Sequence, residues 1–363
     1  MKTVMLVFGT RPEAIKMCPL VNELKSRECI KTVVCVTGQH RQMLDQVLNT
    51  FNVVPDYDLS IMKERQTLFD ITANILNNIG DVLDEVNPDV VLVHGDTSTT
   101  FVTALACYYK QIPVGHIEAG LRTYNIYSPY PEEFNRQAVG IIAKYNFSPT
   151  ELSKQNLLNE GKDPSTIFVT GNTAIDALKT TVKDDYTHEE LEWAKGSRLI
   201  MITAHRRENL GEPMHNMFRA IRRVMDEHSD VKAIYPIHMN PAVRKAAEEE
   251  LGECDRIHII EPLEVLDFHN FLARSFMILT DSGGIQEEAP SLGKPVLVMR
   301  DTTERPEGIK AGTLKLVGTD EDTIYHNFKL LLDDEKVYSA MAKANNPYGD
   351  GFACKRIADV LCK

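Results

Sequence analysis

Short apolar runs alternate with amphipathic stretches along this chain, and that alternation limits its possible folds more than any other feature. Each run has the length and continuous apolar character of a strand buried on both faces, and each stretch between runs has helical periodicity. The rhythm restarts after Gly196. The predicted strands are residues 4–8, 32–36, 90–93, 114–117 and 145–148, then 199–203, 232–235, 257–260, 277–280 and 295–299. This pattern predicts an α/β chain with two doubly wound, Rossmann-like domains that face a cleft.

The 363 residues exceed one usual domain, in keeping with two. We expect an N-terminal domain over residues 1–175, a polar linker region over 176–197 and a second domain over 198–345. Residues 346–363 are expected to form a C-terminal helix that can pack back on the first domain. Ligands of open α/β sheets bind beyond the carboxyl ends of the strands, so the loops there should carry the chemistry.

Charge and cysteine usage exclude several classes of protein. Lys and Arg total 40 against 52 Asp and Glu, a net charge of -12, which argues against a nucleic-acid partner. No segment is long and apolar enough to cross a membrane. The cysteines form no CxxC pair and no zinc-ligand spacing, which predicts reduced thiols, no metal and a cytoplasmic location. They are Cys18, Cys29, Cys35, Cys107, Cys254, Cys354 and Cys362.

The segment 279–289, LTDSGGIQEEA, resembles a strand end, a two-glycine turn and a helix start. Ser282, Gly283 and Gly284 would let backbone N–H groups approach an anion, and Glu288 lies one helical turn further on. A phosphate-binding turn with a nearby carboxylate for ribose hydroxyls suggests a nucleotide diphosphate. Taken alone, a strand-to-helix turn that needed glycines explains the segment equally well.

Two loops of the first half carry further candidates. Arg11 and Lys16 follow the first strand and could bind phosphate, although Lys16 could be a solvated helix charge and Arg11 could pair with Glu13. Asp96 follows the strand at 90–93. It could act in the cleft or cap a helix, two compatible roles.

Two more carboxylates follow the next strand. Alternation along the strand puts His116 and Glu118 on one side, and Glu118 could be a general acid or base or a partner of Arg122. Glu132 follows Pro131 at a helix start, where a carboxylate also stabilises the helix dipole.

His205 and Arg206 lie at the end of the first strand of the second half, just beyond residue 203. These residues could hold a diphosphate, and His205 could transfer protons near neutral pH. A structural histidine and arginines paired with neighbouring carboxylates are the alternatives. The chain has no GxSxG, Walker A, HExxH or GxGxxG motif, so a serine hydrolase, an NTPase, a zinc protease and an NAD enzyme lose support.

Taken in order, these motifs resemble the bacterial-type non-hydrolysing UDP-N-acetylglucosamine 2-epimerases, essentially from end to end. The matching runs are FGTRPEAIK at 8–16, VHGDT at 93–97, GHIEAGLR at 115–122, PEE at 131–133, GNT at 171–173, HRREN at 205–209, TDSGGIQEE at 280–288 and PSLGKPVLVMRDTTERPE at 290–307.

The resemblance implies a GT-B-like fold and reversible conversion of UDP-GlcNAc to UDP-ManNAc for cell-surface polysaccharide synthesis. UDP would leave by anti elimination, giving 2-acetamidoglucal, and then add back, with no cofactor. The implied catalytic residues are Asp96, Glu118, Glu132 and His205. The implied substrate-binding residues are Arg11, Lys16, Arg206, Ser282, Gly283, Gly284, Glu288 and Arg305. The implied site for an activating second UDP-GlcNAc comprises Gln39, Gln42, Arg65 and His238, and the implied oligomer is a homodimer.

Three alternatives stay open at this point. A UDP-sugar glycosyltransferase of the same fold explains the Ser-Gly-Gly turn but leaves the first-half carboxylates without roles. The others are a catalytically silent UDP-sugar sensor and a hydrolysing epimerase. If the turn holds a leaving group during the reaction, Gly284→Ala should lower kcat and not only raise KM.

Overall fold

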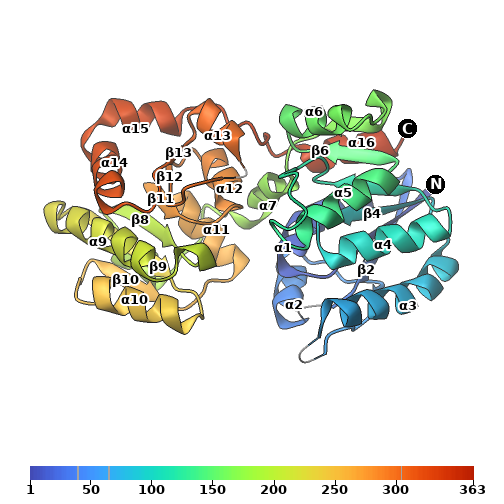
Figure 1. Ribbon diagram of the computed structural model, residues 1–363, viewed down its shortest axis with the longest axis horizontal. Coiled ribbons are helices and arrows are strands. Elements are labelled where there is room, and N and C mark those ends of the chain that lie inside the picture. Colours follow the sequence, from blue (N-terminus) through green and yellow to red (C-terminus); the bar gives the residue numbers. More distant parts are fainter. Residues whose placement is uncertain (39–40, 64–65, 304) are drawn as a thin grey trace. The chain divides into compact units, whose positions relative to one another are not determined.

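The computed structural model describes residues 1–38, 41–63, 66–303 and 305–363 (Figure 1). The chain divides into two compact units. The first comprises Met1–Thr180 with Tyr348–Lys363, and the second comprises Thr181–Pro347. No helix in the described ranges combines the length and the apolar character that a membrane span requires.

Within its described residues, the first unit contains a parallel sheet in the order β3-β2-β1-β4-β5-β6-β7. The strands are β1 (Lys2–Phe8), β2 (Ile30–Val36), β3 (Tyr57–Asp58), β4 (Val90–His94), β5 (Val114–Ile117), β6 (Tyr145–Ser148) and β7 (Ile167–Val169). The helices are α1 (Arg11–Lys25), α2 (Arg41–Thr50), α3 (Leu68–Val86), α4 (Ser98–Tyr109), α5 (Glu132–Ile142), α6 (Glu151–Asn159) and α16 (Ala353–Leu361); α7 (Thr173–Thr181) ends at the boundary of the unit.

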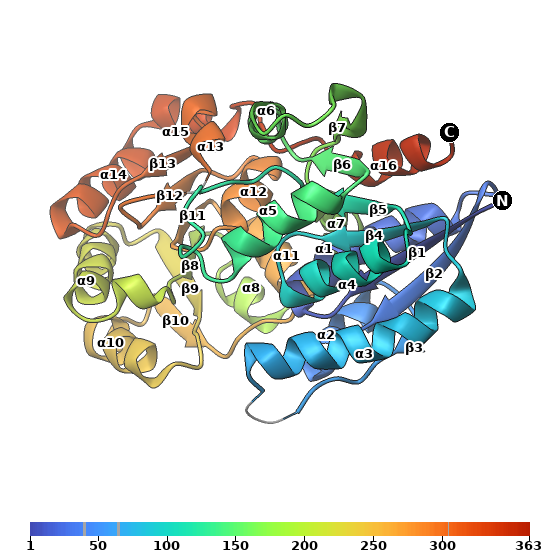
Figure 2. The same cartoon turned by 45° about the vertical axis from the view of Figure 1, so that its right-hand side comes forward.

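Both faces of this sheet are covered, which explains why its strands are apolar throughout. Met5 and Val7 of β1 pack with buried residues of α3 and α4 on one face. Helices α3, α4 and α5 contact one another in series, and α1 contacts α2 and α16 (Figure 2). The C-terminal segment therefore belongs to the first unit, although residues 181–347 separate it from the rest of that unit in sequence.

The second unit repeats the plan with a sheet in the order β10-β9-β8-β11-β12-β13, again counted over described residues. The strands are β8 (Arg198–Thr203), β9 (Val231–Pro236), β10 (Ile257–Ile260), β11 (Met277–Thr280), β12 (Val296–Val298) and β13 (Leu314–Leu316). The helices are α8 (Glu189–Trp193), α9 (Glu212–Glu227), α10 (Pro241–Leu251), α11 (Val265–Arg274), α12 (Ile285–Ser291), α13 (Pro306–Ala311), α14 (Glu321–Asp333) and α15 (Glu335–Ala342).

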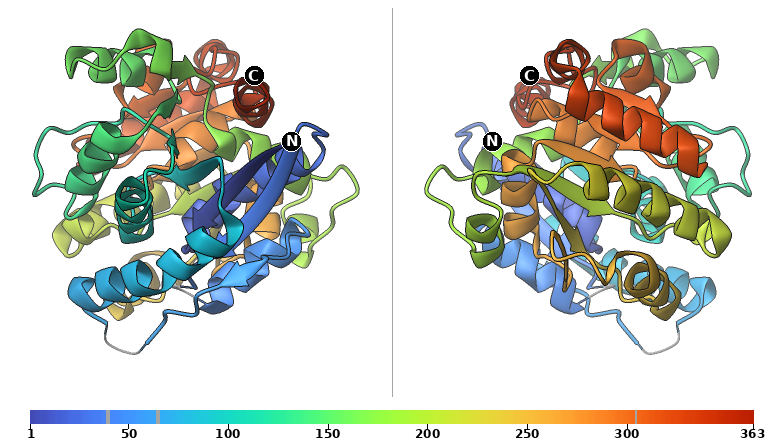
Figure 3. Two further views of the ribbon diagram at one scale, coloured as in Figure 1. Left: turned by 90° about the vertical axis from the view of Figure 1, so that its right-hand side faces the viewer. Right: turned by 90° about the vertical axis from the view of Figure 1, so that its left-hand side faces the viewer.

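Helices also cover both faces of the second sheet. Ile200 and Ile202 of β8 pack in a cluster with residues of α9, α10 and α14, which lie on the near side of the right-hand view in Figure 3. Met201, which points the other way, packs in a cluster with residues of α11 and α12. Residues 181–197, expected as part of a linker, lie in the second unit. There, Tyr186 Oη donates a hydrogen bond to Asp267 Oδ1 at 2.6 Å.

Each sheet contains one switch point. This is a pair of neighbouring strands whose following connections lead in opposite directions along the sheet. It lies between β1 and β4 in the first unit and between β8 and β11 in the second. Ligands of doubly wound folds bind at such points, beyond the carboxyl ends of the strands. We therefore expect the loops that follow these four strands to carry the functional residues.

The expectation that the cysteines are all reduced is wrong in the structure. A disulfide joins Cys29, which precedes β2, to Cys362, which follows α16. The packing of α16 on α1 brings these residues together across 333 positions of sequence, a proximity that sequence spacing does not reveal. Five cysteines are free and buried: Cys18, Cys35, Cys107, Cys254 and Cys354.

Candidate active site

A buried carboxylate joins the two loops at the first switch point. Glu13 Oε2 accepts hydrogen bonds from the backbone N–H groups of Gly9 (3.1 Å) and Thr10 (2.8 Å). Its Oε1 accepts one from Thr97 Oγ1, in the loop after β4, at 2.7 Å. Burial raises the pKa of Glu13, against the opposing effect of these hydrogen bonds. This role of Glu13 was not predicted from sequence, although Thr10 followed three residues later by Glu13 is a capping-box pattern, which the structure forms at α1.

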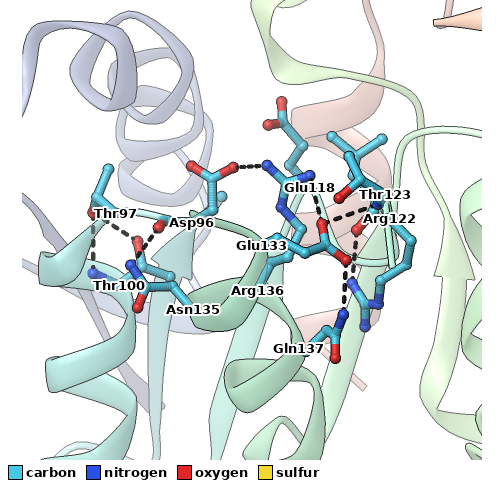
Figure 4. A network of polar contacts seen from close by, with 12 residues as sticks. Asp96, Thr97, Thr100, Glu118, Arg122, Thr123, Glu133, Asn135, Arg136 and Gln137 are labelled. Atoms are coloured by element: carbon cyan, nitrogen blue, oxygen red, sulfur yellow. Dashed lines mark hydrogen bonds and ion pairs between the residues drawn. The ribbon is translucent and has the colours of Figure 1, made fainter. Parts of the chain in front are cut away.

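Asp96 follows β4, and two residues of α5 hold it. Its carboxylate forms an ion pair with Arg136, and its backbone carbonyl accepts a hydrogen bond from Asn135 Nδ2 at 2.8 Å (Figure 4). The alternative role of Asp96 as a helix cap is wrong, because Thr97 caps α4. The Asp96 carboxylate thus stands at the switch point, 27% exposed and paired with Arg136.

Glu118 lies directly after β5, with a left-handed backbone (φ 66°). Because it lies beyond the strand, the alternation that pairs it with His116 does not extend to it. Its carboxylate forms an ion pair with Lys16 of α1 and accepts a hydrogen bond from Asn172 Nδ2 at 3.2 Å. Buried His94 places Nε2 3.7 Å from Glu118 Oε2.

The structure excludes Arg122, the partner that sequence suggested for Glu118. Arg122 instead makes a bidentate pair with Glu160, with Nε–Oε1 at 2.6 Å and Nη2–Oε2 at 2.9 Å. The partner of Arg122 therefore comes from the end of α6, 38 residues further along the chain.

Glu132 and Glu133 begin α5 but lie in different environments. Glu132 is partly exposed, and in the described part of the chain its side chain makes no hydrogen bond or ion pair. Glu133 is fully buried and is hydrogen-bonded to the loop after β5. Glu132 was predicted from sequence and Glu133 was not, because adjacent residues of one type give no signal of which is buried.

Buried Asp281 organises the switch point of the second unit. Its Oδ2 accepts hydrogen bonds from the backbone N–H groups of His205 and Arg206, both at 2.9 Å, and from Asn209 Nδ2 at 3.2 Å. His205 Nδ1 lies 3.4 Å from Asp281 Oδ1. Burial lowers the pKa of His205, against the opposing charge of Asp281. Asp281 is a second residue to which sequence analysis gave no role, although it precedes the Ser-Gly-Gly turn.

The turn itself leaves two backbone donors available. Ser282 N–H donates to Thr280 Oγ1 at 2.9 Å. The N–H groups of Gly283 and Gly284 have no protein acceptor within the described residues.

Two arginines border this turn. A Cβ placed on Gly283 would lie 2.8 Å from Arg305 Nη1 and 3.5 Å from Arg206 Nη2. Arg305 is in turn fixed by buried Glu287, whose Oε1 accepts a hydrogen bond from Arg305 Nε at 2.5 Å. Positively charged hydrogen-bond donors and the two backbone N–H groups thus lie close together, an arrangement that suits an anion with several oxygens.

Two further residues predicted to bind substrate are Glu288 and Arg11. Glu288 is in α12, with Oε2 3.8 Å from Nε2 of buried His269. Arg11 begins α1, directly after its cap residue Thr10. Each stands within its unit at the end of the sheet that carries the switch point.

Of the residues expected to bind an activator, Gln39 and Arg65 lie outside the described residues. Gln42 is in α2, but its side chain is outside the described part. His238 is exposed, and its ring stacks with that of His205 at a centroid separation of 5.5 Å. The structure therefore places one of the four against a candidate catalytic residue.

Comparisons with known proteins give a consistent picture. A family model described as UDP-N-acetylglucosamine 2-epimerase matches residues 22–362. The UDP-N-acetylglucosamine 2-epimerase of Bacillus subtilis (strain 168) is 63% identical over 358 residues, which cover 99% of this chain and 94% of the relative.

Solved structures agree with this similarity. A crystal structure of a UDP-N-acetylglucosamine 2-epimerase is 60% identical, with a TM-score of 0.92, covering 99% of this chain and 96% of the other. The UDP-GlcNAc 2-epimerase of Neisseria meningitidis, bound to UDP-GlcNAc, is 49% identical with a TM-score of 0.90 and 99% coverage of both chains.

Proposed function

Because this chain belongs to the UDP-N-acetylglucosamine 2-epimerase family and is therefore an isomerase, we propose that it interconverts UDP-GlcNAc and UDP-ManNAc by elimination and re-addition of UDP. The observation that carries the proposal is the kind of group that stands at each switch point. The first unit presents the carboxylates of Asp96, Glu118 and Glu132. The second presents the Ser-Gly-Gly turn with its bordering arginines. We assign proton transfer to the first set and binding of the diphosphate to the second.

The chemistry requires both sets. The hydrogen at C2 of the sugar is not acidic, because no neighbouring ketone stabilises a carbanion. Proton removal must therefore accompany departure of UDP, with positive character at C1 and formation of 2-acetamidoglucal. Donors to the diphosphate stabilise the charge that develops on the leaving group. We assign this role to the N–H groups of Gly283 and Gly284, together with Arg206, Arg305 and His205.

Inversion at C2 requires proton transfer on both faces of the sugar. Asp96 and Glu118 are each paired with a cation, whereas Glu132 has no side-chain partner among the described residues. We assign the removal and return of the C2 proton to these three carboxylates together. Glu288 is assigned to the ribose hydroxyls, and Arg11 and Lys16 complete the substrate-binding residues.

Incubation of the protein with UDP-GlcNAc as its only substrate tests this function. NMR should show UDP-ManNAc forming to a constant ratio, with UDP and glucal only in trace. Interconversion without an acceptor excludes a pure glycosyltransferase. Steady accumulation of UDP with free ManNAc would instead show a hydrolysing enzyme.

The catalytic assignments are tested by substitution. Asp96→Asn, Glu118→Gln and Glu132→Gln should each lower kcat by about 10²- to 10⁴-fold, because each removes a group that carries a proton. Unchanged rates in all three variants would remove the assignments.

We also propose a homodimer that serves cell-surface polysaccharide synthesis in the cytoplasm and is activated by a second UDP-GlcNAc. Gln39, Gln42, Arg65 and His238 are assigned to the activator. The contact of the His238 ring with His205 supports a link between the two sites. Activation predicts a sigmoidal forward rate curve and a reverse reaction that requires added UDP-GlcNAc. A hyperbolic curve, with a reverse reaction that runs from UDP-ManNAc alone, would contradict it.

A further inference from the structure

A buried carboxylate without a role in this scheme lies beside Glu132. Glu133 is fully buried, and every partner of its side chain is a donor (Figure 4). Oε2 accepts from the backbone N–H of Thr123 at 3.0 Å, and Oε1 accepts from that of Tyr124 at 2.9 Å. Gln137 Nε2 donates to Oε1 at 2.8 Å. Glu133 thus fastens the loop after β5 to α5.

The fourth partner of Glu133 connects it to Asp96. Arg136 Nη1 lies 3.3 Å from Glu133 Oε2, and Arg136 Nη2 forms the ion pair with Asp96 Oδ2. One guanidinium therefore bridges the two carboxylates. Arg136 is 9% exposed, and its Nε has no hydrogen-bond partner in the described part of the chain. The direction of this guanidinium is consequently set by the two carboxylates that it joins.

We propose that Glu133 is a positioning residue for the epimerisation, which holds Arg136 in the orientation that places the Asp96 carboxylate. The inference rests on the proposed function, since Asp96 is there assigned to proton transfer. A glutamine at position 133 has the right size but presents an NH₂ group to partners that are all donors. Glu133→Gln therefore breaks at least one of these contacts and removes the negative charge that faces Arg136.

A double-mutant cycle on kcat tests the proposal. Its variants are Glu133→Gln, Arg136→Gln and the double variant, assayed by interconversion of UDP-GlcNAc and UDP-ManNAc. Glu133→Gln should lower kcat by about 10- to 100-fold, the cost of a misplaced group, with KM changed less than kcat. Once Arg136 is replaced, further replacement of Glu133 should leave kcat unchanged, because Glu133 acts through Arg136.

Glu160→Gln is the matched control. It removes the carboxylate at the end of α6 that pairs with Arg122 of the same loop, and no interaction recorded in the described part of the chain joins it to Asp96. Its kcat should equal that of the wild type. If Glu133→Gln does not fold, Glu133→Asp takes its place in the cycle.

Three results would overturn the inference. A Glu133 variant with wild-type kcat would show that the residue is not needed for catalysis. Losses that multiply in the double variant would show that Glu133 acts on folding or on another group, not through Arg136. A wild-type protein that does not interconvert the two sugars would instead refute the proposed function, and the inference with it.

Discussion

At Gly283 the space that a side chain would occupy is taken by arginine. A Cβ there would lie 2.8 Å from Arg305 Nη1, closer than real Cβ contacts come. Gly284 differs, because among the described residues its Cβ would meet only Glu288 Oε1, at 3.9 Å, and its φ of -62° is available to any residue. The two glycines of the turn therefore have separate reasons to be glycine. Gly283 admits the guanidinium of Arg305, whereas Gly284 has no such need within the protein.

We predict that Gly283→Ala lowers kcat/KM by about tenfold or more, because it displaces Arg305 from the turn. Gly284→Ala should fold with an unchanged thermal midpoint. If it also lowers kcat, the diphosphate approaches this residue during the reaction; an effect on KM alone would make the turn a simple ligand holder. Steady-state kinetics and thermal unfolding of both variants give these values. Wild-type kinetics in Gly283→Ala would contradict the role given to Arg305.

Residue types were easier to predict than their partners. The partners of Asp96 and Arg122 could not be predicted from sequence, since each is remote in the chain. Arg136, 40 residues away, pairs with Asp96, and Glu160 takes Arg122 from Glu118. Glu13 and Asp281 were missed for the same reason. Their hydrogen bonds join loops that only the parallel sheets bring together.

Among the elements, neighbouring strands β4 and β5 carry buried histidines at their carboxyl ends. Burial lowers the pKa of His94 to about 3 and that of His116 to about 4. His116 Nε2 forms a hydrogen bond with Gly95 O at 2.7 Å, which holds the loop that leads to Asp96. Both rings therefore stay neutral in the folded protein near pH 6.5, where the same histidines begin to bind a proton in the unfolded chain.

The difference between the folded-state and unfolded-state pKa values of these histidines predicts that acid destabilises the folded protein. Both folded-state pKa values lie below the usual 6.5, so the unfolded state binds more protons and the free energy of unfolding falls as pH decreases from about 6.5 towards 4. Each histidine contributes at most about 1.4 kcal/mol per pH unit. The raised pKa of Glu13 has the opposite effect. Above pH 4.5, its usual pKa, the folded state binds more protons at this residue, so a fall in pH there favours folding.

Comparison with a variant isolates the contribution of His116. His116→Gln can still donate to Gly95 O but does not titrate, so its urea midpoint should depend less steeply on pH. His326→Asn, at an exposed position of α14, is the control and should follow the wild type. Equal pH dependence in His116→Gln and the wild type would contradict this account.

For the whole molecule, the doubly wound α/β fold and the family were predicted correctly from sequence. The repeated strand–helix rhythm specifies two parallel sheets, and long motifs in order identified the family. The strands that sequence analysis missed, β3, β7 and β13, have two or three residues each, too few for a periodic signal. The pairing of Cys29 with Cys362 was also missed, because it depends on a C-terminal segment that returns to the first unit.

The central claim is that UDP leaves and returns while the proton at C2 is exchanged. It is tested most directly by NMR of UDP-GlcNAc incubated with the protein in D₂O. The account predicts deuterium at C2 of both UDP-GlcNAc and UDP-ManNAc, because the carboxylates of Asp96, Glu118 and Glu132 take their protons from solvent. Interconversion of the two sugars with the original hydrogen retained at C2 would contradict it.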